Sequence, residues 1–298
     1  MTGQAEEKRA SRPRVVVAAV DGSEDGTRAL DYAASEARHR GLGLRLVHVR
    51  PETAMMSPMA PVIPEYTLHE FGVEVVTDAE DHVRSSGWTG PGLEVVLETG
   101  PRLPRLLRHL DDAACVVVGR RGSAAEHLLT GSTTSSLAAH APVPVLCVPT
   151  GWPTEGRHGL VGVGLKSFDL AGPILASAFD EARSRYARVE VLHAWRPADP
   201  YDAAVYGRVE TGRWSASARD ALSDCVHREQ PGGDVEWYVD AAYDLPAHAL
   251  RQLSARADLL VVGRRGHARV SLRHLGPVTA ALLRSSACPV LVVPDESR

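Results

Sequence analysis

The sequence lacks two things: an apolar stretch long enough to cross a membrane, and an excess of positive charge. Among its 298 residues, 33 are Lys or Arg and 37 are Asp or Glu, which gives a formal net charge of -4 at pH 7. A membrane-spanning helix needs about 20 consecutive apolar residues, and a nucleic-acid surface needs clustered cations. Met1–Arg14 has no apolar signal-peptide core. We therefore expect a cytoplasmic protein with no membrane or nucleic-acid partner and a disordered tail over residues 1–13.

Cysteine is also scarce, and its spacing excludes the common metal and redox motifs. The four cysteines are Cys115, Cys147, Cys225 and Cys288, and no two of them form a C-x-x-C pair. Three of them lie within or beside apolar, strand-like runs. We expect buried, reduced thiols and no metal site.

Several signatures of nucleotide enzymes are missing as well. The chain contains no G-K-[ST] of a phosphate-binding P-loop, no H-x-G-H of a nucleotidylyl transferase and no S-G-G-x-D of an ATP pyrophosphatase. No side chain is well placed to act as a general base on an attacking water. We therefore predict no enzymatic activity and no catalytic residues.

What the sequence does contain is an internal repeat. Val116–Gly122 returns as Leu260–Gly266 at an offset of 144, and Pro144–Pro149 returns as Pro289–Pro294 at an offset of 145. The first copy is thus one residue shorter between these two landmarks. A self-similar period of this length predicts two copies of one domain, which we place at 14–150 and 158–298 with a linker over 151–157.

Each copy alternates short β-branched runs with stretches of helical spacing. Near-continuous apolar strands joined by right-handed helical crossovers predict an α/β, Rossmann-like fold: two tandem, doubly wound five-stranded parallel sheets with helices on both faces. In the first copy we expect strands at 14–20, 43–49, 93–98, 114–119 and 144–148, and helices at 26–40, 65–86, 101–111 and 131–140. In the second we expect strands at 159–164, 188–194, 234–239, 257–263 and 289–293.

Two segments of the first copy carry candidate chemistry. Ligands of such sheets bind outside the carboxyl ends of the strands, where the winding reverses. Val20–Ser23 ends the first strand, and Asp21 could accept hydrogen bonds from a ribose hydroxyl or a base amino group. Gly119–Ser132 joins a strand to a helix, so its glycines permit close approach to phosphates and the helix start offers unpaired N–H groups. Arg120 or Arg121 could add positive charge.

The pattern G-x-x-G, a spacer and G-[ST], with V-D-G-S before it and A-P-V-P-V-L-C-V-P after it, resembles the universal stress protein family. The resemblance covers residues 14–149 and 158–294. It implies a stress-response regulator that binds ATP, with Mg²⁺, in its first domain and hydrolyses it slowly at most. The nucleotide contacts that it implies are Val20, Asp21, Val49, Gly119, Gly122, Gly131, Ser132 and Thr133.

The resemblance also implies partners. The last strands, Val143–Val148 and Val290–Val293, would pair the two copies into an intramolecular pseudo-dimer, and a homodimer and an unknown protein partner would extend the assembly. An uncovered sheet edge is open to such association.

The two copies depart from the family pattern differently. The first has eight spacer residues where the ATP-binding branch has nine. The second keeps nine but has Pro277 in place of the hydroxyl residue and, by our alignment, Gly164 in place of the Asp. Proline offers neither a hydroxyl nor an N–H, so we predict a degenerate site in the second copy.

Plainer interpretations remain open. The Gly119–Ser132 segment could be an ordinary connection with Ser132 as a helix cap, and Asp21 could merely turn the chain into the first helix. His48 and His193 are expected to be packed, hydrogen-bonded core histidines. The alternative function is a nucleotide-independent universal stress scaffold with both sites inactive.

Overall fold

The computed structural model divides into two compact units, Met1–Thr154 and Glu155–Arg298. It describes residues 14–52, 63–120, 133–153, 158–168, 171–196, 201, 204, 211–230, 232–264 and 275–294. In that part of the chain, no helix is both long and apolar enough to cross a membrane.

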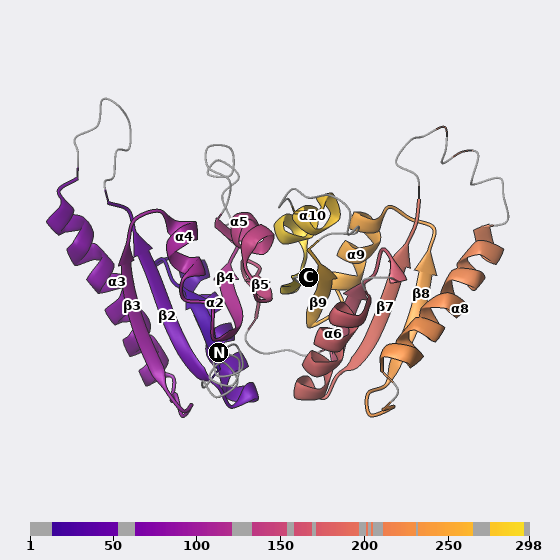
Figure 1. Ribbon diagram of the computed structural model, residues 1–298, viewed down its shortest axis with the longest axis horizontal. Coiled ribbons are helices and arrows are strands. Elements are labelled where there is room, and N and C mark those ends of the chain that lie inside the picture. Colours follow the sequence, from indigo (N-terminus) through magenta and orange to yellow (C-terminus); the bar gives the residue numbers. More distant parts are fainter. Residues whose placement is uncertain are drawn as a thin grey trace, which may run out of the picture. The chain divides into compact units, whose positions relative to one another are not determined.

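Unit 1 is a parallel five-stranded sheet with strand order β3-β2-β1-β4-β5 (Figure 1). Its strands are β1 (Val15–Ala19), β2 (Gly43–Arg50), β3 (Leu93–Thr99), β4 (Ala113–Gly119) and β5 (Val145–Val148). Its helices are α2 (Glu24–Arg40), α3 (Glu65–Ser85), α4 (Arg102–Leu107) and α5 (Thr133–His140). The winding reverses between β1 and β4, which lie side by side in the middle of the sheet.

Unit 2 repeats this arrangement, with strand order β10-β9-β6-β7-β8. Its strands are β6 (Leu160–Gly164), β7 (Arg188–Ala194), β8 (Trp237–Ala242), β9 (Leu259–Gly263) and β10 (Val290–Val293). Its helices are α6 (Ala171–Arg185), α8 (Thr211–Glu229), α9 (Pro246–Ser254) and α10 (Pro277–Ser285). Its winding reverses between β6 and β9.

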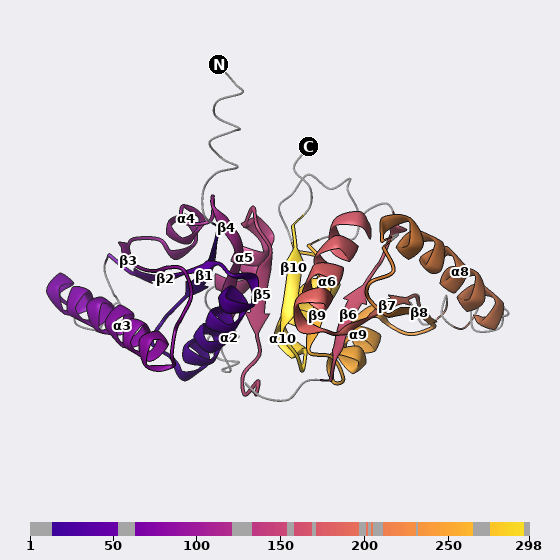
Figure 2. The ribbon, with the colours of Figure 1, turned by 90° about the horizontal axis from the view of Figure 1, so that it is seen from below.

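Helices cover both faces of each sheet. In unit 1, α2 and α3 lie on one side and α4 on the other; in unit 2, α6 and α8 lie opposite α9 and α10 (Figure 2). Strands buried on both faces are apolar along most of their length, and β4, β5, β9 and β10 consist largely of buried Val, Leu and Cys. The predicted doubly wound α/β fold is confirmed.

Two predicted boundaries are wrong. The strand expected at 234–239 is β8, Trp237–Ala242. It starts later because the chain turns at Gly233 (φ 62°), and it ends later because Ala242 still pairs with Ala194 of β7. The helix expected at 101–111 ends at Leu107, because the chain must turn to bury Leu110 completely before β4.

One ion pair occurs in both units with its charges exchanged. In unit 1, Arg45 on β2 binds Asp112 through two bonds of 2.7 and 3.0 Å and also contacts Glu94. In unit 2, Glu190 on β7 binds Arg256 and accepts a 2.5 Å bond from the hydroxyl of Tyr238. Arg45 and Glu190 are equivalent because they pair with the third residues of β1 and β6. Hydrogen bonding to Asp112 raises the pKa of Arg45, so the guanidinium stays charged.

We predict that the charges of the Arg45–Asp112 pair can be exchanged only if Arg45, Glu94 and Asp112 are all replaced together. Asp112→Arg alone places two cations together in a partly buried site and should lower the free energy of unfolding by about 1–3 kcal/mol. Adding Arg45→Glu and Glu94→Tyr reproduces the arrangement of unit 2 and should restore most of that loss. Urea unfolding measures both variants. A triple variant no more stable than Asp112→Arg would contradict the interpretation.

A strained turn distinguishes the two units. After α2, Gly41 adopts a left-handed conformation (φ 63°), and the next amide bonds back to Ala37. After α6, Tyr186 occupies the same position with φ 54°, and the next amide bonds back to Ala182. The Tyr186 side chain is 97% exposed. A residue with a Cβ is therefore held in a conformation that favours glycine, without compensating burial.

We predict that Tyr186→Gly raises the free energy of unfolding by about 1 kcal/mol, because it removes the left-handed strain. The reciprocal change, Gly41→Tyr, should lower it by a similar amount. Both are measured by urea unfolding of the full chain. Destabilisation by Tyr186→Gly would show that the exposed ring makes an interaction that outweighs the strain.

Candidate functional site

The turn between β1 and α2 holds Asp21 in one orientation. Its Oδ1 accepts hydrogen bonds from the Ser23 amide (3.1 Å) and the Ser23 hydroxyl (2.6 Å). Ser23 is also the N-cap of α2, because its hydroxyl oxygen accepts from the Gly26 amide at 3.0 Å. Gly22 permits the turn with φ 75°. The carboxylate is thus fastened at the positive end of α2, where negative charge is stabilised.

The end of β4 lies directly against this turn. A Cβ atom on Gly119 would lie 2.7 Å from the backbone oxygen of Asp25, so only glycine allows the contact. Thr150 bridges the same two segments, because its hydroxyl lies 3.0 Å from the Arg120 carbonyl oxygen and 3.1 Å from Asp25 Oδ2. The two segments predicted to form the site are therefore joined at the reversal of winding.

We predict that Gly119→Ala lowers the free energy of unfolding by about 1–3 kcal/mol, because α2 must move away from β4 to admit the methyl group. Gly92→Ala is the matched control, since a Cβ atom there meets nothing within 4 Å. Urea unfolding compares the two variants. Equal stability would mean that the contact at Gly119 yields without cost.

The other predicted site residues are only partly described. Thr133 is half-buried and begins α5, and Thr134, which the sequence analysis did not single out, donates to the Gly119 carbonyl at 3.4 Å. Val20 and Val49 are buried at the ends of β1 and β2. Gly122, Gly131 and Ser132 lie outside the described residues. The structure therefore places Asp21, Gly119 and Thr133 at the carboxyl end of the sheet.

The predicted role of His48 is confirmed, and His193 makes the predicted hydrogen bond but is only half-buried. His48 is buried, and its Nδ1 donates to the Val20 carbonyl at 2.8 Å. Burial lowers the pKa of His48, so the ring is neutral at pH 7. His193 makes the same bond to Leu165 at 2.9 Å. Both rings fix the backbone at the end of the first strand of their unit.

These histidines correct the alignment of the second copy. Because His48 binds Val20 and His193 binds Leu165, Val20 corresponds to Leu165. The residue that replaces Asp21 is then Lys166, and the assignment of Gly164 was wrong. The register of β1 with β2 and of β6 with β7 leads to the same offset of 145. The two His residues in the sequence could have revealed it.

Unit 2 therefore differs from unit 1 by a reversal of charge as well as by Pro277. Lys166 is exposed, and an ammonium group donates hydrogen bonds but accepts none. Pro277 begins α10, so the first residue of that helix has no N–H. One hydrogen bond between the helix and the strand end is the same in both units. Thr279 donates to the Gly263 carbonyl at 2.9 Å, as Thr134 does to the Gly119 carbonyl.

The cysteines are structural, as predicted. None of the four forms a disulfide, and all are buried. Burial raises the pKa of Cys147 and of Cys288 to about 12, so neither forms a thiolate at neutral pH. Among the residues that the structure describes, no three His, Cys, Asp or Glu side chains are grouped to hold a metal ion.

Comparisons with known proteins identify the family of this chain. The model of the universal stress protein family matches residues 13–149 and again 160–294. The universal stress protein Rv2005c of Mycobacterium tuberculosis is 30% identical over 299 aligned residues, which cover 95% of this chain and 98% of that protein. A universal stress protein of Archaeoglobus fulgidus has the same fold, with a TM-score of 0.71, 17% identity and coverage of 95% and 97%. One solved in complex with cAMP is 24% identical and covers 46% of this chain and 98% of its own, with a TM-score of 0.37. The chain thus belongs to the universal stress protein family and carries two tandem copies of its domain.

Proposed function

We propose that unit 1 binds one ATP, with Mg²⁺, at the carboxyl end of β1 and β4, and that the bound nucleotide regulates a stress response. The observation that carries this proposal is the joining of the Asp21 turn to the Gly119 end of β4 at the reversal of winding. Parallel α/β sheets bind their ligands at this position.

The donor and acceptor groups at this end fit a nucleotide. A carboxylate accepts hydrogen bonds from ribose hydroxyls or a base amino group, and Ser23 already orients that of Asp21. Thr133 adds a hydroxyl at the start of α5, where backbone N–H groups favour a phosphate. Magnesium would be held mainly by the phosphate oxygens. The remaining predicted contacts, Gly122, Gly131 and Ser132, belong to the same proposal.

The residues of unit 2 do not fit a second nucleotide, which favours one nucleotide site per chain. Lys166 cannot accept the bonds proposed for Asp21, and Pro277 has no N–H or hydroxyl for a phosphate. A hydrogen bond to a charged group contributes about 1.5–3 kcal/mol, so the loss of several would weaken binding by orders of magnitude. We propose that unit 2 is a structural partner with a degenerate site.

The proposed action is conformational and not catalytic. A ligand shifts an equilibrium only between states for which its affinity differs, so nucleotide would bias the surface offered to a protein partner in the cytoplasm. Any ATP hydrolysis would be slow and incidental. Pairing of the units through β5 and β10, with or without a homodimer, is part of this proposal.

We predict that Mg·ATP titrated into nucleotide-free full-length protein gives a saturable one-to-one isotherm. Asp21→Ala should weaken binding by about 10- to 150-fold, the equivalent of one charged hydrogen bond. Asp21→Asn, which keeps an acceptor for Ser23, separates loss of charge from loss of the hydrogen bonds that hold the turn. Isothermal titration calorimetry measures all three proteins.

Lys166→Ala is the matched control at the equivalent position, and we expect it to bind ATP as the unmodified protein does. A stoichiometry of two, or a loss in Lys166→Ala equal to that in Asp21→Ala, would contradict the assignment to unit 1. If the unmodified protein gives neither heat nor thermal stabilisation with ATP, the nucleotide-independent scaffold becomes the better account.

A further inference from the structure

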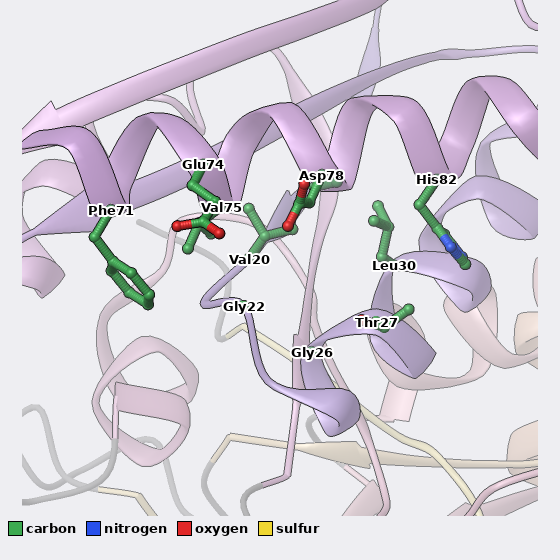
Figure 3. Close-up of a pocket in the computed structure, with 11 residues that line it drawn as sticks. Val20, Gly22, Gly26, Thr27, Leu30, Phe71, Glu74, Val75, Asp78 and His82 are labelled. Atoms are coloured by element: carbon green, nitrogen blue, oxygen red, sulfur yellow. The ribbon is translucent and has the colours of Figure 1, made fainter.

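A pocket of about 380 Å³ lies between α2 and α3 of unit 1, beside the turn that holds Asp21 (Figure 3). This volume is within the range of small-molecule sites, about 300–1,000 Å³. Of the described residues predicted to bind nucleotide, only Val20 lines it. The full lining is Val20, Gly22, Gly26, Thr27, Leu30, Phe71, Glu74, Val75, Asp78, Ala79 and His82.

Two carboxylates project from α3 into this pocket. Glu74 and Asp78 are one helical turn apart, and Figure 3 shows both pointing toward the Gly22 turn and α2. Both are exposed, and neither forms an ion pair or hydrogen bond with any residue that the structure describes. Arg28 of α2 does not neutralise them, because it is paired with Glu24 and Asp25. Within the described part of the chain, no positive charge is paired with either carboxylate of the pocket.

The rest of the lining is apolar at one end and closed by a polar pair at the other. Phe71 is 56% exposed beside Glu74, and aromatic faces attract organic cations. Val75 and Leu30 are buried and form the floor. At the far end, His82 Nε2 lies 2.6 Å from Asp31 Oδ1, which ties α3 to α2.

Helix α8 of unit 2 is the equivalent of α3, and one alignment of the two helices matches two of the four buried positions of each. Gly72 and Val83 are buried on α3 and lie eleven residues apart. Ser215 and Val226 are buried on α8 and have the same separation. Matching these two pairs places each residue of α3 opposite the residue of α8 whose number is higher by 143.

In this alignment the helix face of unit 2 lacks the charges. Trp214 corresponds to Phe71, so an aromatic ring is present in both units. Glu74 and Asp78, by contrast, correspond to the uncharged residues Ser217 and Ala221. In this alignment unit 2 retains the aromatic ring without the carboxylates, so the two charges are particular to unit 1.

We infer that this pocket binds an aliphatic diamine or polyamine. Its ammonium groups would bond to Glu74 and Asp78, and its methylene chain would lie over Phe71 and Val75. Charge-assisted hydrogen bonds supply the attraction, and the apolar lining favours a hydrocarbon chain over a hydrated metal ion. The inference does not depend on nucleotide binding.

The test is titration of the nucleotide-free full chain with 1,4-diaminobutane and with spermidine, followed by calorimetry and NMR shifts. We expect one saturable site and at least about tenfold weaker binding in the double variant Glu74→Gln/Asp78→Asn. The carboxamides keep the side-chain shape, and circular dichroism checks that the fold is retained. 1,4-Butanediol, which has the same chain but no charge, should not bind.

The matched control is Glu70→Gln/Asp81→Asn, which removes two exposed charges from the same helix outside the pocket. We expect this variant to bind the amines as the unmodified protein does. Equal weakening in both double variants would reduce the effect to general counterion attraction and overturn the proposal, as would the absence of saturable binding. Because no nucleotide is present, neither result bears on the proposed ATP site.

Discussion

The carboxyl end of unit 1 depends on one close contact, that between the start of α2 and the end of β4. Gly119 admits the Asp25 carbonyl at a distance that no side chain would allow, and Thr150 bonds across the same junction. Ser23 then caps α2 and orients Asp21. A single steric requirement therefore sets the position of the candidate nucleotide contacts relative to one another.

The two copies preserve the contacts that shape the backbone and differ in the charges displayed on it. His48 and His193, and likewise Thr134 and Thr279, make equivalent bonds to backbone carbonyls. The Arg45–Asp112 pair of unit 1 is replaced in unit 2 by the Glu190–Arg256 pair, in which the charges are exchanged. Lys166, by contrast, removes a hydrogen-bond acceptor from the carboxyl end of the unit 2 strands. Both units thus keep the contacts of the scaffold, while the charge at the Asp21 position is reversed.

The pocket between α2 and α3 adds a second contrast between the copies. Helices α2 and α3 bury mainly small or apolar residues, and the two carboxylates lie at exposed positions that face the groove. Unit 1 has two carboxylates there, whereas the equivalent positions of unit 2 hold a serine and an alanine. The two units thus share one architecture but offer different surfaces.

The sequence alone determined the fold class, the tandem organisation, the hydrogen-bonded histidines and the buried thiols, because hydrophobic periodicity and internal repetition can be read along the chain. It also located the Asp21 and Gly119 segments. It misplaced the equivalent of Asp21 by two residues, since apolar strings align equally well in several registers and only the His48 and His193 bonds select one. The tertiary structure alone decided that Asp21 is held by Ser23, that Gly119 must lack a side chain and that α2 and α3 enclose a charged pocket. Each of these depends on how close two segments come in space, which a linear pattern does not encode.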